Sequence, residues 1–227
     1  MDIKIYTVYH LQDQIKKYQL HETDNIKLYN TNENVENSIN DLNPYMAELV
    51  LQYRIWKNNI KSDYIGFQHY RRILFDSEIR LNKCIDIINN NNVIIYSTFN
   101  DHYNSSWDDL LKLYRIENLK TDIDEFMETK NEYVQKKYKN FKFHKFIPKY
   151  CTFVTSWDIF KKYGDFALSF IDFINDKYNL QFNKDKWEKF INDKTPLNKR
   201  SMSLVLEMLF GLYFSTYHRC ILKNNLF

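Results

Sequence analysis

The fold is decided by the stretch Asp63-Tyr64-Ile65-Gly66-Phe67-Gln68-His69-Tyr70-Arg71-Arg72. Its first six residues are mostly apolar and β-prone, which predicts a strand buried on both faces. Strands of this kind are typical of parallel sheets that carry helices on each side. Gly66 stands in mid-strand, where a glycine weakens a sheet unless another part of the chain packs closely against the backbone.

Four polar side chains follow this predicted strand at once: His69, Tyr70, Arg71 and Arg72. In open α/β sheets, ligands bind beyond the carboxyl ends of the strands. Each arginine offers a fixed fork of donors that matches pairs of phosphate oxygens. The segment therefore predicts a binding site for a phosphate-bearing ligand. From these residues alone, ion pairs with surface carboxylates are an equal alternative.

The sequence before this segment predicts a strand and a helix. Ile3–Tyr9 is β-rich and leads into His10 at the expected end of the strand. Asn43 and Pro44 predict the cap and first turn of a helix, which runs with one apolar stripe to about Asn58.

The rest of the chain continues this alternation and becomes richer in helix. The other predicted elements are a loop with a short helix or strand inside it at 11–41, a helix at 78–88, a strand at 93–96, helices within 105–140, a strand at 150–154, and helices at 157–178, 184–193 and 200–217. This order predicts an α/β fold with a mostly parallel sheet flanked by helices and a helix-rich C-terminal half.

Composition limits the classes of protein that fit. The chain has 227 residues, of which 44% are hydrophobic, so it can bury a sizeable core as one domain. A net charge of +3 is low for a dedicated nucleic-acid binder. Three widely spaced cysteines include no Cys-x-x-Cys pair, which fits a reducing cytoplasm (that of the host, for a viral protein). No signal peptide and no membrane span are expected.

Three segments within residues 42–72 together resemble the signature of a known family. They are 42–49 (Leu-Asn-Pro-Tyr-Met-Ala-Glu-Leu), 53–58 (Tyr-Arg-Ile-Trp-Lys-Asn) and 63–72. The pattern resembles that of bacterial and large-virus glycosyltransferases of capsular or exopolysaccharide biosynthesis, whose third segment reads Asp-Tyr-Ile-Gly-x-x-His-Tyr-Arg-Arg. Weaker similarity covers 5–10, 102–110, 149–160 and 206–210. Within it, Trp107 replaces a usual His and Met208 replaces a usual Arg.

The resemblance implies one GT-A-like domain over residues 1–227. Residues 1–100 would bind a nucleotide-diphosphate sugar, and the helical residues 101–227 would face a glycan acceptor in surface polysaccharide or glycoprotein glycan synthesis. The resemblance implies donor-binding roles, with the arginines on the diphosphate, for His10, His69, Tyr70, Arg71 and Arg72. It implies catalytic or supporting roles for Glu48, Asp63 and Glu207.

Each of these three acidic residues also has a structural interpretation. Glu48 falls off the apolar stripe of its predicted helix, which suits a base or a partner of His69, but also an exposed carboxylate. Asp63 could bind a ribose or an arginine, or could simply begin a turn. Glu207 stands in an apolar helix, where it either lines the acceptor-binding side of the protein or lies on the solvent-exposed face of the helix.

A divalent cation, manganese or magnesium, is one way to neutralise a leaving diphosphate. Arg71 and Arg72 offer the other way, as preorganised positive charge. The only Asp-x-Asp sequence of the kind that often holds such a metal is Asp122-Ile123-Asp124, and the acids at a helix start are its better interpretation. No metal ligands are therefore assigned.

Two rival functions remain. Lysines and aromatic residues alternate over residues 136–145, as in modules that bind single-stranded nucleic acid, although the low net charge argues against that function. Alternatively, the chain is a catalytically inactive relative that binds a nucleotide or glycan, because the later family motifs have lost a His and an Arg.

Overall fold

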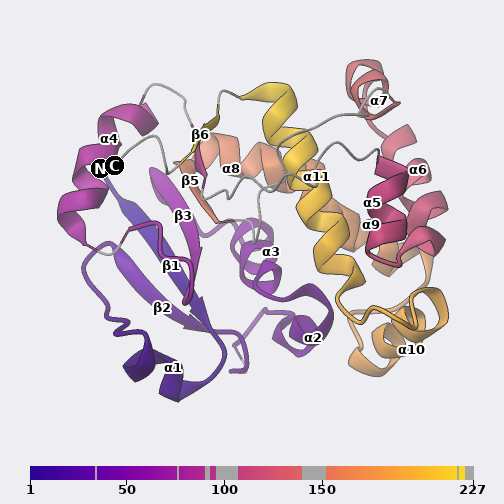
Figure 1. The fold of residues 1–227 in the computed structure, drawn as a ribbon, viewed down its shortest axis with the longest axis horizontal. Helices are drawn as coiled ribbons and strands as arrows, with labels where there is room; N and C mark the ends of the chain where they lie inside the picture. The colour runs from indigo at the N-terminus through magenta and orange to yellow at the C-terminus, as the bar shows by residue number, and fades with distance from the viewer. Residues whose placement is uncertain are drawn as a thin grey trace.

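The computed structural model describes residues 1–33, 35–75, 77–89, 93–95, 107–139, 152–218 and 220–222. Within these residues a six-stranded sheet lies beside helices from the second half of the chain (Figure 1). The strands are β1 (Ile3–Tyr9), β2 (Ile26–Asn30), β3 (Tyr64–His69), β4 (Val93–Ile95), β5 (Phe153–Ser156) and β6 (Cys220–Leu222).

Helices occupy most of the remaining described chain. The α-helices are α1 (Gln12–Lys17), α2 (Asn43–Met46), α3 (Leu49–Lys57), α4 (Glu78–Asn89), α5 (Trp107–Leu113), α6 (Lys120–Glu128), α7 (Glu132–Lys139), α8 (Trp157–Tyr163), α9 (Ser169–Lys177), α10 (Lys184–Lys194) and α11 (Ser201–Tyr217). Short segments are the 3-10 helices η1 (Asn40–Leu42) and η2 (Glu117–Leu119) and the π-helical η4 (Gly164–Leu168). None of the helices in the described ranges is long and apolar enough to cross a bilayer.

The strands lie in the order β2-β1-β3-β5-β4-β6. Among them, β5 alone runs antiparallel to its neighbours β3 and β4, and the other pairings are parallel. The expected α/β fold with a mostly parallel sheet and a helix-rich C-terminal half is therefore confirmed. Within the predicted loop over residues 11–41, the chain forms both a short helix and the edge strand β2.

Strand β3 is buried on both faces, as its sequence predicts. Ile65 and Phe67 belong to the main apolar cluster, whereas Tyr64 packs against a smaller cluster on the other face. Gly66 has no room for a side chain, because a Cβ there would lie 2.5 Å from Ile5 Cδ1 and 3.1 Å from the carbonyl oxygen of Phe153. Close packing between β1 and β5 thus explains the glycine in mid-strand.

The single helix predicted from Asn43 to Asn58 is wrong, because the chain breaks at Ala47. Its φ of 52° and ψ of −140° separate α2 from α3, and the residue before α2, Leu42, takes the cap position expected of Asn43. A non-glycine residue at positive φ costs stability and needs the surrounding packing to hold it. The break places Glu48 at the start of α3 and turns it towards the interior.

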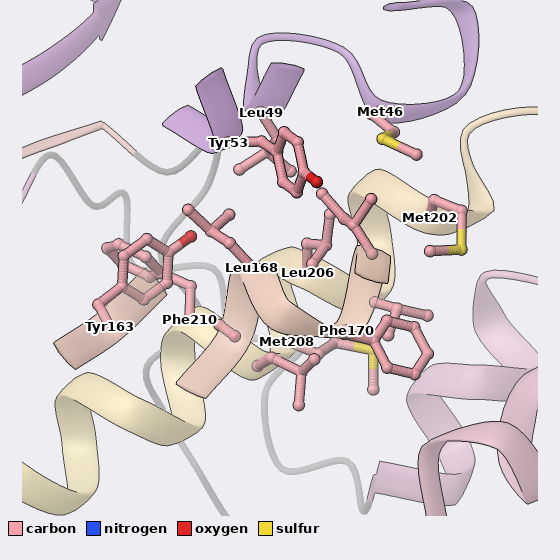
Figure 2. Close-up of a cluster of buried hydrophobic side chains, with 14 of the residues drawn as sticks. Met46, Leu49, Tyr53, Tyr163, Leu168, Phe170, Met202, Leu206, Met208 and Phe210 are labelled. Atoms are coloured by element: carbon pink, nitrogen blue, oxygen red, sulfur yellow. The ribbon is translucent and has the colours of Figure 1, made fainter. Parts of the chain in front are cut away.

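One large apolar cluster joins the sheet to the C-terminal helices. Residues from α2 and α3, such as Met46 and Leu49, share this cluster with Leu168, Met202 and Leu206 (Figure 2). The first turns of α11 consequently pack beside α2, although more than 150 residues separate them in sequence. This packing brings the start of α11 towards the edge of the sheet.

The long helix predicted over 157–178 forms as α8, the π-helical segment η4 and α9. A Cβ on Gly164 would lie 2.2 Å from Cδ1 of Trp56, so the indole ring rests directly on the glycine backbone. Trp56 Nε1 also donates a hydrogen bond to Asp165 Oδ1 at 2.9 Å. The helix takes its π-helical turn at the point where this ring packs. Such turns are rare and occur mostly as single turns within α-helices.

Candidate functional site

The polar residues after β1 and β3 meet at one edge of the sheet. Strand β1 is paired with β2 on one side and with β3 on the other, so the chain changes direction across the sheet at the β1–β3 boundary. Ligands of open α/β sheets bind at the carboxyl ends of strands where this switch occurs. His10 follows β1 there, and His69 is the last residue of β3.

A tight turn fixes the residues that follow β3. The Arg72 backbone N–H donates to the His69 carbonyl at 2.7 Å, and the Tyr70 N–H donates to the Val8 carbonyl at 3.0 Å. The Arg71 N–H donates to His69 Nδ1 at 3.3 Å. These bonds hold the His-Tyr-Arg-Arg segment against the end of β1.

The surroundings of both histidines at this edge favour the neutral ring. Burial, with help from His10 and the nearby arginines, lowers the pKa of His69 to about 3. Burial also lowers the pKa of His10, whose Nδ1 lies 2.5 Å from Thr31 Oγ1 after β2. Because His69 Nδ1 accepts a hydrogen bond, the proton of its neutral ring lies on Nε2, which is therefore a donor.

Tyr70 is buried among other rings. Its ring centroid lies 4.1 Å from that of His69, 5.9 Å from that of His10 and 5.0 Å from that of Tyr18. The Arg71 guanidinium lies 5.1 Å from the same centroid. These contacts give Tyr70 a packing role, and its donor-binding role stays a prediction.

Glu48 lies buried beneath a group of cations. Burial raises the pKa of its carboxyl group, against the opposing effects of a hydrogen bond from its own backbone and of the guanidinium groups of Arg200, Arg72 and Arg71. The sequence placed Glu48 off the apolar stripe, and the helix break at Ala47 turns that position inward. A buried carboxyl group beside several arginines is a partner for them rather than a surface charge.

Arg200 belongs to this site, and sequence reasoning missed it. It stands at the N-cap of α11, and its charge acts on His10, Glu48 and His69. An arginine opposes the positive end of a helix dipole. That unfavourable placement ahead of a long apolar helix is the signal that could have pointed to it.

We call Arg71, Arg72 and Arg200, whose charges act on Glu48, the arginine cluster. Arg71 and Arg200 are exposed, Arg72 is half-buried, and Glu48 is buried. The cluster therefore carries a surplus of positive charge beside two neutral imidazoles. Such an arrangement can hold a multiply charged anion and stabilise negative charge that develops on it.

Two of the predicted residues lie away from this cluster. Asp63 precedes β3 at its opposite end, about 20 Å from His69 at a rise of ~3.3 Å per residue. Its carboxylate accepts from the Asp2 N–H at 2.7 Å and lies 3.8 Å from the amino group of Met1, so the expectation that Asp63 supports the arginines is corrected. Glu207 is half-buried in α11, about 10 Å along the helix from Arg200.

Other sequence signals have structural explanations. Asp122 is buried in the first turn of α6, where it binds Lys177 at 2.7 Å and Lys194 at 3.3 Å. Tyr138 in the lysine-rich stretch packs edge-on against Trp107 and donates to Asp124. Residues 140–151, like 102–106, lie outside the described residues.

The described side chains do not fit a resident metal ion. Within the described parts of the chain, no three His, Cys, Asp or Glu side chains gather as possible ligands. At the cluster, three guanidinium groups would also repel a cation.

Residues 4–218 match the family described as a domain of unknown function, DUF4422, and the chain belongs to this family. Its fold is similar to that in the apo structure of WbbM, a bifunctional glycosyltransferase. The TM-score is 0.65 and the identity 17%, over 97% of this chain and 44% of WbbM. The chain thus spans less than half of that protein. No curated protein matches the sequence.

Proposed function

We propose that this chain is a glycosyltransferase that moves a sugar from a nucleotide-diphosphate donor to a glycan acceptor. The observation that carries the proposal is the arginine cluster at the β1–β3 switch point, on a fold similar to that of a glycosyltransferase. A diphosphate is the anion that such a donor presents, and forked guanidinium groups match its oxygens.

The cluster would act mainly on the leaving group. When the bond from the anomeric carbon to the diphosphate oxygen breaks, negative charge grows on that oxygen. Arg71, Arg72 and Arg200 are already in place, so little reorganisation opposes the reaction. His69 would add the Nε2–H donor identified above.

Glu48 would position the arginines. Three guanidinium groups repel each other, and the ionised form of the buried Glu48 carboxyl group would offset part of that repulsion. The alternative role, a base that takes the proton of the acceptor hydroxyl, belongs equally to Glu207 on α11. Glu48→Gln would separate the roles, because loss of a positioning residue weakens nucleotide binding, whereas loss of a base lowers turnover and leaves binding unchanged.

Calorimetric titration with uridine, guanosine, thymidine and cytidine diphosphates tests the proposal. At least one should bind, and Arg72→Ala should weaken its binding about 10- to 100-fold, the effect of a lost charged hydrogen bond. The matched control is Arg80→Ala, an exposed arginine on α4. The proposal fails when no diphosphate binds, or when both variants behave alike.

Two further arms refine this test. Titration in the presence and absence of manganese reports whether a divalent cation contributes to affinity. Release of free nucleoside diphosphate from a set of nucleotide-sugars distinguishes an active transferase from an inactive relative that only binds. Free nucleoside diphosphate appears only when the sugar has been transferred to water or to an acceptor.

A further inference from the structure

A pocket lies at the other end of α11 from the arginine cluster. It has a volume of 490 Å³, which is in the range of small-molecule sites. Its walls come from the start of α7, from α8 and η4, and from the last turn of α11. Tyr213 follows Arg200 by 13 residues, so the pocket is about 20 Å from the cluster along the helix.

Aromatic rings form one wall of this pocket. The ring centroids of Phe166 and Tyr213 are 5.4 Å apart, and those of Tyr213 and Tyr217 are 5.2 Å apart. Tyr217 is 41% exposed, and the ring of Tyr133 on α7, which is not part of the pocket lining, lies 6.1 Å from it. The exposed ring of Tyr217 on the otherwise packed helix α11 offers a flat apolar face to a ligand.

Hydrogen-bonding groups of both kinds also line this pocket. Lys130 and Lys162 are donors, Asp165 is an acceptor, and Asn131 can serve as either. The ammonium group of Lys130 lies 3.9 Å from the centre of the Phe126 ring, and burial lowers its pKa to about 8. At pH 7 Lys130 still carries most of its charge, so the two lysines and Asp165 leave the pocket with a smaller positive surplus than the arginine cluster.

This mixture favours one class of ligand. A phosphate would face the Asp165 carboxylate, and a cation would face two lysines. Hydroxyl groups both donate and accept, and the C–H faces of a sugar ring are apolar. A saccharide therefore matches the aromatic rings and the mixed polar groups of the pocket together.

We propose that this pocket binds a sugar unit of the glycan acceptor, remote from the reacting end. Its assignment to the acceptor rests on the proposed function. Because the pocket is about 20 Å from the arginine cluster, the acceptor is an oligosaccharide or polysaccharide rather than a single sugar. The pocket then selects for chain length.

An array of neutral and acidic oligosaccharides, applied to the full chain, is the probe. The best-binding compound is then titrated against the wild-type protein, Tyr217→Ala and Tyr217→Phe. Loss of the ring in Tyr217→Ala should weaken binding about tenfold or more, whereas Tyr217→Phe keeps the ring face and the affinity. Circular dichroism melting curves check that each variant folds. Lys162→Met tests a second exposed residue of the pocket lining.

The outcomes separate the pocket from the proposed function. Failure of every oligosaccharide to bind, or equal binding by the wild type, Tyr217→Ala and Lys162→Met, overturns the pocket. Nucleoside diphosphate binding would survive that result and leave the proposed function standing. Conversely, glycan binding that depends on Tyr217 in a protein that binds no nucleoside diphosphate keeps the pocket as a saccharide site and ends the proposed function.

Discussion

His69 shows at the scale of one residue how the fold sets a charge. Its imidazole is 5% exposed and holds its pKa at about 3, whereas an unfolded histidine titrates near ~6.5. Between these values the unfolded chain binds one more proton than the folded chain. The free energy of unfolding should therefore fall by about 1.4 kcal/mol for each pH unit below ~6.5.

Urea unfolding at pH 7 and pH 5 measures this effect. We expect the wild type to lose roughly 2 kcal/mol more than His69→Gln over that interval, because the glutamine cannot take up the proton. His10 is present in both proteins, so the difference reports His69. An equal loss in both proteins would contradict the neutral, buried state of the ring.

Arg200 gives a prediction in which affinity and stability change in opposite directions. Arg200→Ala should weaken nucleoside diphosphate binding about tenfold, because one charged hydrogen bond to the anion is lost. The same change removes a cation from the N-terminus of α11 and should raise the free energy of unfolding by about 0.3–1 kcal/mol. Calorimetry and urea unfolding measure the two quantities.

Lys199→Ala is the control for this pair of measurements. Lys199 is exposed beside Arg200 but acts on none of the three titrating groups of the site. Its replacement should leave the affinity unchanged. Equal losses of affinity in both variants would show that Arg200 contributes only general positive charge.

At the scale of elements, the contact between Trp56 on α3 and Gly164 in η4 decides how two helices meet. Gly164→Ala should destabilise the protein by about 1–3 kcal/mol, because the added methyl group overlaps the indole ring. In a Trp56→Leu background the same substitution should cost less, since the smaller side chain leaves room. A double-mutant cycle by urea unfolding measures this coupling. Additive effects would show that the two residues do not constrain each other.

At the scale of the whole molecule, Asp122 ties three helices together. Its buried carboxylate on α6 accepts from Lys177 and Tyr178 at the end of α9 and pairs with Lys194 on α10. Asp122→Asn should lower the free energy of unfolding by about 2–4 kcal/mol, less than for fully buried pairs because both lysines reach solvent. Asp108→Asn, in an exposed pair with Lys120, should cost less than about 1 kcal/mol.

Nucleoside diphosphate affinity distinguishes a structural network from a binding site in these variants. The hydrogen bonds and ion pairs of the Asp122 network join α6, the end of α9 and α10. Asp122→Asn should therefore retain the wild-type affinity at a temperature where it is folded. A loss of affinity as large as that of Arg72→Ala would contradict this separation.

The sequence by itself determined the elements whose signals are local. The strand that ends at His69 could be predicted, with its two buried faces and its glycine, because burial repeats along the chain with the period of the backbone. The helices of the second half could be placed for the same reason. The arginines at the end of that strand were also visible, since they follow it directly.

Only the tertiary structure decided which distant residues join them. Arg200 reaches the site from α11, and Asp63 is carried to the opposite end of β3, because the direction and packing of elements depend on contacts far apart in sequence. Glu48 turns inward through a backbone break at Ala47 that no periodic pattern encodes. Local periodicity reports which face of an element is buried, whereas the partner on that face is fixed only when the whole chain packs.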